Sequence, residues 1–112
     1  MAELAHAPLS NAQFKVLKTY TKVDSDFEDN MLDLMVADAS AEIAKGVTTS
    51  MTPEDFLASD ELRDRFLMAL FKQVKENYDY RGEGSEIMRY PLIEPVNAII
   101  NQLRTEVVGS AD

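Results

Sequence analysis

The fold is decided by ELRDRFLMALFKQVKENY, residues 61–78. Apolar side chains recur in this stretch at steps of three and four residues and cover well over half of a helix circumference, which predicts a helix with several helical neighbours. They are Leu62, Phe66, Leu67, Ala69, Leu70, Phe71, Val74 and Tyr78. At about 1.5 Å per residue such a helix is ~27 Å long, about the width of a small domain. We therefore expect a central helix over about 60–79.

A first helix is predicted to begin after Ser10. Ser10 and Gln13 have the spacing of a capping box, in which side chains satisfy the free amide hydrogens of a helix start. The apolar side of this helix comprises Phe14, Leu17 and Thr21 on one face and Val16, Tyr20 and Val23 on the adjacent face. We expect this broad side to be covered, and the helix to end near Lys22.

A second helix is predicted from a second capping box, Ser25 and Glu28. Its apolar stripe consists of Phe27, Met31, Leu34, Met35, Ala39 and Ile43. Gly46 follows the stripe, and we expect it to end the helix in the left-handed conformation that glycine adopts readily.

The remaining chain predicts a short helix and a last amphipathic helix. Thr52 is a helix cap before Pro53, so a short helix should run to about residue 58. Pro95 stands in the first turn of the last helix, after a loop over about 81–90. The fold class is therefore all-α, a small bundle of four main helices plus a short extra helix. We expect a single domain over 1–112, with flexible tails at about 1–9 and 109–112.

Length and composition exclude several classes of protein. The 112 residues suffice for one domain with a modest core. The absence of cysteine excludes disulfides, thiolate metal sites and cysteine nucleophiles. The longest apolar run, residues 66–71, is far shorter than the roughly 20 residues of a membrane-spanning helix, so we expect no membrane association. Glu3 stands where a signal peptide carries basic residues, and we expect the chain not to be exported.

The negative charge is concentrated in one part of the chain. The formal net charge is −9, and residues 24–64 contain twelve acids but two bases. Lys15, Lys18 and Lys22 form a small basic cluster directly before this block. A domain that grips duplex DNA needs a basic stripe that displaces counterions from phosphates, which this chain lacks. An acidic surface repels DNA, which suits a passage for DNA or a mimic of it.

No catalytic, cofactor or metal site is predicted. His6 is the only histidine, and we expect it to be solvated in the N-terminal tail, so no histidine-based triad or multi-histidine zinc site can form. Residues 24–28 resemble the start of a calcium loop, but Asp29 stands where glycine is required and Met35 where glutamate is required. We expect no enzymatic activity.

Five short motifs occur in a characteristic order. They are FKVLKTYTKVD at 14–24, MLDLM at 31–35, YDYR at 78–81, YPL at 90–92 and NQLR at 101–104. In this order and spacing the chain resembles, over about 14–104, the head–tail connector family (adaptor or head completion proteins) of tailed double-stranded-DNA phages. The loop at 48–58 is longer than expected for that family, and the pair at 94–95 replaces its glycine-like entry to the last helix.

The resemblance implies a structural protein of a phage or prophage virion, made in the bacterial host cytoplasm and built into the head–tail junction. Subunits of this kind form a ring of about a dozen copies between the portal protein and a tail completion or stopper protein. DNA passes through the centre of the ring without specific binding.

Opposite charges can meet between the subunits of such a ring. We expect Lys15, Lys18 and Lys22 to pair across the subunit boundary with acidic residues of 24–33 or of 54–64, which can also supply negative charge to the lumen. The first acidic group includes Asp24, Asp26, Glu28 and Asp29. The alternative is that these lysines are only solvated.

Three further residues are candidates for contact with portal or tail components. Arg81 and Tyr90 lie at the ends of the loop before the last helix, and Arg104 lies near the end of that helix. The alternative for Arg81 and Tyr90 is that they brace the loop onto the core.

A different function is compatible with the same composition. A monomeric acidic helical module that binds proteins, such as an inhibitor that mimics the charge of DNA, would occupy the basic cleft of its target. Salt-sensitive binding to a basic DNA-handling protein, without ring formation, would favour this alternative.

Overall fold

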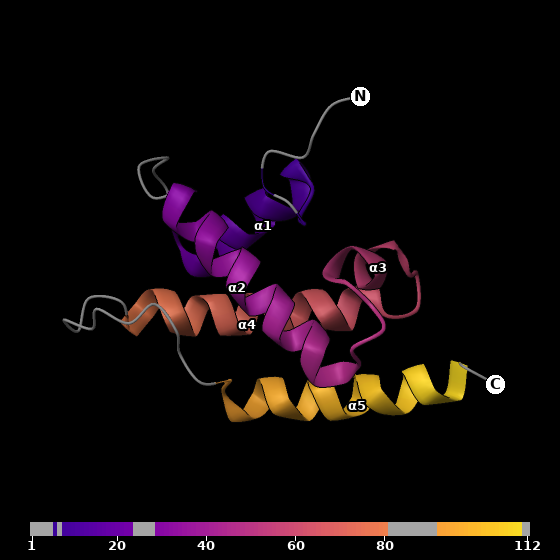
Figure 1. Ribbon diagram of the computed structural model, residues 1–112. Helices are drawn as coiled ribbons and strands as arrows, with labels where there is room; N and C mark the ends of the chain where they lie inside the picture. The colour runs from indigo at the N-terminus through magenta and orange to yellow at the C-terminus, as the bar shows by residue number, and fades with distance from the viewer. Residues whose placement is uncertain (1–5, 7, 24–28, 81–91, 111–112) are drawn as a thin grey trace.

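The computed structural model describes residues 6, 8–23, 29–80 and 92–110. This part of the chain forms five helices and no strand, which confirms the all-α class and the bundle of four main helices with a short extra one. The helices are α1 (Asn11–Thr21), α2 (Asp29–Val47), α3 (Pro53–Ala58), α4 (Arg63–Tyr80) and α5 (Glu94–Ser110). Figure 1 shows α2 crossing α4, with α5 below and α3 beside the start of α4.

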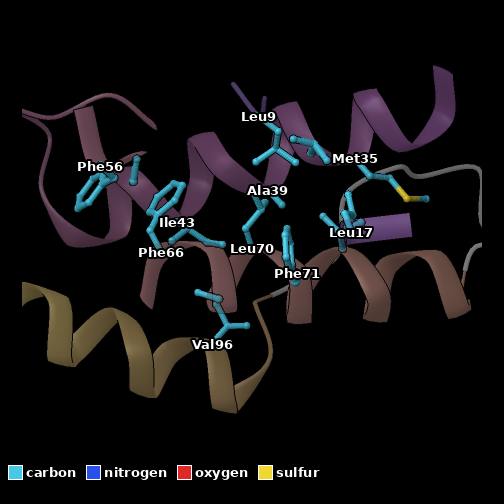
Figure 2. Packing of buried hydrophobic residues seen from close by; sticks show 14 of the residues in the cluster. Leu9, Leu17, Met35, Ala39, Ile43, Phe56, Phe66, Leu70, Phe71 and Val96 are labelled. Atoms are coloured by element: carbon cyan, nitrogen blue, oxygen red, sulfur yellow. The ribbon is translucent and has the colours of Figure 1, made fainter. Parts of the chain in front are cut away.

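α4 is the central helix, as the sequence predicts, and it packs against each of the other four helices. Phe66, Ala69, Leu70 and Val74 are fully buried along it. Figure 2 shows Phe66 and Leu70 together with Ile43 of α2 in the core. The apolar core is therefore built around α4.

The beginning of α4 is determined by Ser59. Its Oγ accepts a hydrogen bond from the amide of Leu62 at 3.2 Å, and its carbonyl accepts one from the amide of Arg63 at 2.9 Å. Residues 60–62 form a turn. The helix consequently begins at Arg63 rather than at about residue 60.

α1 begins as predicted. The Ser10 hydroxyl accepts a hydrogen bond from the Gln13 amide, and the Gln13 side chain accepts one from the Ser10 amide. Lys22 ends the helix in the left-handed conformation, with φ 62°. The predicted breadth of the apolar side is wrong at Val16, which is exposed because α1 packs against α4 through its other face.

The predicted apolar stripe of α2 is confirmed at Met35, Ala39 and Ile43 and is wrong at Leu34. Leu34, a member of the predicted stripe, is 63% exposed, whereas Leu32 and Val36 are fully buried. The reason is that α4 and α5 both pack on α2 and together bury a row that the spacing alone does not distinguish. The buried row consists of Leu32, Val36, Ala39 and Ile43, with Met35, Ser40, Ala44 and Val47 beside it. The predicted capping box of this helix falls on residues outside the described ranges.

Gly46 does not end α2 in a left-handed conformation, contrary to the prediction. It lies within the helix, which continues to Val47. A Cβ atom at position 46 would lie 3.3 Å from Cδ1 of Ile100 in α5, which is closer than ordinary van der Waals contact. The glycine therefore leaves room for the close approach of Ile100, and a Cβ atom here would require the isoleucine side chain to shift.

α3 forms as predicted, with Thr52 as its N-cap and Pro53 in its first turn. Thr52 Oγ1 accepts a hydrogen bond from the Asp55 amide, and the Asp55 carboxylate accepts one from the Thr52 amide. Phe56 is fully buried, and its ring stacks on that of Phe66 with the centroids 4.8 Å apart. This stack fixes α3 to the beginning of α4.

α5 is anchored by a buried polar side chain that the sequence does not single out. Gln73 of α4 is 1% exposed; its Oε1 accepts a hydrogen bond from the amide of Ile93 at 2.9 Å, and its Nε2 donates one to Asn77 Oδ1 at 2.8 Å. α5 then runs to Ser110, so its backbone is helical at 109 and 110, where a tail is predicted.

Replacing Gln73 by leucine is expected to destabilise the protein by about 2–3 kcal/mol. The variant leaves the Ile93 amide and the Asn77 carbonyl oxygen without this partner, and a buried unsatisfied polar group costs about 1–3 kcal/mol. Urea denaturation measures the loss, and faster hydrogen exchange at the Ile93 amide would locate it. The exposed Gln102→Leu on α5 is the matched control; equal stability of the two variants would contradict the role assigned to Gln73.

The N-terminal residues that the structure describes are packed onto the fold, so the predicted tail over 1–9 is wrong for them. Leu9 is fully buried. The His6 ring stacks on Phe14 with the centroids 3.7 Å apart, and His6 Nδ1 lies 2.8 Å from Asp33 Oδ1. His6 is therefore a packed residue that joins α1 to α2, and not a solvated one.

Candidate functional site

The three lysines of α1 share one pocket at the surface. Lys15 and Lys18 lie three residues apart on one face of α1, and Lys22 is the left-handed residue that ends the helix. They open onto a hollow of about 620 Å³, whose other lining residues are Asn11, Phe14, Thr19, Val23 and Asp29. We call this hollow the lysine pocket. Its charge is predominantly positive, on a protein whose net charge is −9.

Lys18 and Asp29 form an ion pair inside the chain. The distance between Lys18 Nζ and Asp29 Oδ1 is 2.9 Å, and the two side chains are 15% and 26% exposed. Asp29 stands in the first turn of α2, where a negative charge is also favoured by the helix dipole. Lys18 and Asp29 thus neutralise each other within one chain at the wall of the pocket, and pairing of the α1 lysines between subunits stays a prediction.

Lys15 and Lys22 differ from Lys18 in their surroundings. Both side chains are exposed, and within the described ranges neither forms an ion pair. These two ammonium groups are accordingly the ones available to a partner.

Five acids lie on α3, in the turn that follows it and in the first turn of α4. Glu54, Asp55, Asp60, Glu61 and Asp64 are all exposed. We call this group the acidic corner. Asp55 caps α3, and Asp60 pairs with Arg63 at 3.1 Å. In the part of the chain that the structure covers, no ion pair involves Glu54, Glu61 or Asp64.

Arg104 has a defined place in the fold. Its Nε donates a hydrogen bond to the carbonyl of Gly46 at 2.7 Å, and one terminal nitrogen donates to Asn101 Oδ1 at 3.2 Å. The guanidinium thus satisfies a carbonyl group at the end of α2, where the helix leaves its last carbonyls without partners. The side chain is still exposed, so contact between Arg104 and another protein stays a prediction.

The other predicted interface residues cannot be placed. Asp24, Asp26, Glu28, Arg81 and Tyr90 lie outside the described residues. Their predicted contacts with neighbouring subunits, portal or tail proteins therefore stay predictions.

The described residues contain no group of three or more histidine, aspartate or glutamate side chains that could hold a metal ion. Nor does any described helix combine the length and apolar character needed to cross a membrane. No protein-family model, curated protein or solved structure matches the chain.

Proposed function

We propose that this chain is a structural subunit of the head–tail connector of a tailed phage or prophage. Its copies form a ring between the portal and a tail completion or stopper protein, and DNA passes through the centre. The resemblance of residues 14–104 to that family supports this proposal, together with a small all-α fold of five helices.

The observation that carries the proposal is the separation of opposite charges on one subunit. The lysine pocket includes Asp29, the first residue of α2, whereas the acidic corner begins with α3; Figure 1 shows that α2 begins on the side of the molecule away from α3. Two different complementary patches on one chain favour head-to-tail association, in which each copy uses one patch toward each neighbour. Such association closes into a ring when the rotation between neighbours allows it.

The net charge suits the passage of DNA. The chain carries twenty acids against eleven bases. Phosphates are repelled by a negative surface, so DNA moves past such a surface without being held. The proposed role requires contact with proteins at both faces of the ring and no catalytic step.

Native mass and imaging test the proposal. Light scattering over a range of concentrations, at low and at high salt, is expected to give multimers at low salt that negative-stain images show as closed annuli with an open centre. Higher salt should weaken the association because it screens exposed charges. A monomeric mass at every concentration and both salts would contradict self-assembly; salt-sensitive binding of that monomer to a basic DNA-handling protein would favour the acidic binding module.

A further inference from the structure

We infer that the acidic corner of one copy docks at the lysine pocket of the next copy, with Lys15 and Lys22 contacting Glu54, Glu61 and Asp64. This inference rests on the proposed function and assigns the residues of the ring interface. The partner of the pocket is therefore a second copy of this chain.

The pocket is preformed to receive carboxylates. The Lys18–Asp29 pair fixes α1 against the start of α2, and Phe14 is buried at the base of α1. Lys15 lies on α1, and Lys22 stands at the C-cap of that helix, seven residues further along the chain. The exposed ammonium groups of Lys15 and Lys22 therefore line the same pocket as Lys18, whose charge is already neutralised by Asp29.

The acidic corner is held in shape by the fold. The Thr52–Asp55 capping box fixes the beginning of α3, and the stack of Phe56 on Phe66 fixes the helix to α4. With its five acids and Arg63, residues 54–64 carry a formal charge of −4. This corner can approach a cationic surface without reorganisation, and association of preorganised surfaces loses less conformational entropy.

The two surfaces of one chain do not meet each other. α1 packs on α4 near Phe71, since the Tyr20 ring lies 6.0 Å from the Phe71 ring, whereas α3 packs at the beginning of α4 near Phe66. α1 and α3 do not pack against each other. Within the described residues, the acidic corner of the same chain therefore does not supply the charge that faces the pocket.

The sequence leaves open whether the acidic residues of 24–33 or those of 54–64 face the lysines. The geometry favours the second group. Asp29 is held by Lys18 of its own chain. Glu54, Glu61 and Asp64 are exposed and lie on α3, in the turn before α4 and in the first turn of α4, respectively. The acidic corner is for this reason the partner surface, in preference to Asp29.

A charge-exchange experiment tests the interface. The pocket variant carries Lys15→Glu and Lys22→Glu; the corner variant carries Glu54→Lys, Glu61→Lys and Asp64→Lys. Each variant alone is expected to need at least about tenfold more protein for half-assembly, because like charges then face each other at every contact. Lys18 is left unchanged, since its pair with Asp29 supports the fold.

Mixing the two variants is the decisive arm. In an equimolar mixture, the unchanged acidic corner of the pocket variant faces the unchanged lysine pocket of the corner variant. The substituted, acidic pocket of the first variant likewise faces the substituted, basic corner of the second. The mixture is expected to form rings at wild-type concentrations, with the two chains in alternation. Recovery on mixing also shows that each variant is folded.

A matched control distinguishes the effect of substituting interface residues from the effect of changing the net charge. Lys45→Glu with Lys72→Glu changes the net charge as much as the pocket variant does, at lysines that do not line the pocket. This control should assemble like the wild type. Two outcomes would overturn the inference and leave the proposed function standing, provided that the wild type forms rings. One is unchanged assembly of the pocket variant, and the other is no recovery when the two variants are mixed. A wild type that never assembles would overturn both.

Discussion

Replacing Leu70 by aspartate is expected to unfold the protein. Leu70 is fully buried in the middle of α4, the helix against which the other four pack. Burial of a carboxylate without a partner costs far more than the loss of an apolar contact. The whole stability of a domain this size is about 5–15 kcal/mol, so one such charge at the centre removes most or all of it. Far-UV circular dichroism and the dispersion of amide proton resonances measure the outcome.

Met68 provides the control on the same helix. It lies two residues before Leu70 and is 45% exposed. Met68→Asp introduces the same charge into the same helix at a position that water reaches, and is expected to retain a cooperative thermal transition. A native-like transition in Leu70→Asp would contradict the central place of α4 in the core.

Replacing Phe66 by alanine is expected to destabilise the protein by about 3–5 kcal/mol, the usual cost of removing a buried phenylalanine ring. Phe66 is fully buried and carries the stack with Phe56. Phe56 is the one residue of α3 that is buried, so α3 depends on this contact for its position. We therefore expect α3 to separate from α4 before the rest of the protein unfolds.

Urea denaturation measures the loss for Phe66→Ala, and hydrogen exchange at the α3 amides detects the separation. Phe66→Leu is the matched control, because leucine restores much of the apolar volume without the ring stack. The double variant Phe56→Ala/Phe66→Ala should cost less than the two single variants together, since each single change already breaks the stack. Strict additivity would contradict the coupling of α3 to α4 through this pair.

The starts of α1 and α3 are the features that the sequence predicts best. Ser10 with Gln13 and Thr52 with Asp55 lie three residues apart, and the hydrogen bonds of each box join only those neighbours. The information that determines such a cap is therefore complete within four residues of chain.

The exposed face of α2 could not be predicted in the same way. Leu32 and Leu34 are equally apolar and both belong to plausible helical rows, so the choice depends on where α4 and α5 pack. Gln73 and His6 show the same limit, because the Ile93 amide is 20 residues from Gln73 and Asp33 is 27 residues from His6. Tertiary partners at that separation leave no local pattern in the sequence.

The sequence predicts which charged groups belong to the candidate interface, but not which individual residues of those groups are available to a partner. Composition identifies the α1 lysines and both acidic groups, yet it treats Lys18 as equivalent to Lys15 and Lys22. The structure distinguishes them because the side chain of Asp29, eleven residues further along, pairs with Lys18 alone. The division between structural and available charges thus depends on where α2 begins relative to α1.

The contact between Gly46 and Ile100 constrains how the sequence can diverge. A side chain larger than hydrogen at position 46 needs space that the isoleucine branch now occupies, and the terminal Cδ1 is the nearest atom to the missing Cβ. Descendants of this gene that acquire alanine at 46 should therefore acquire valine or a smaller residue at 100. Substitutions at these two sites are expected to be inherited together, although 54 positions separate them along the chain.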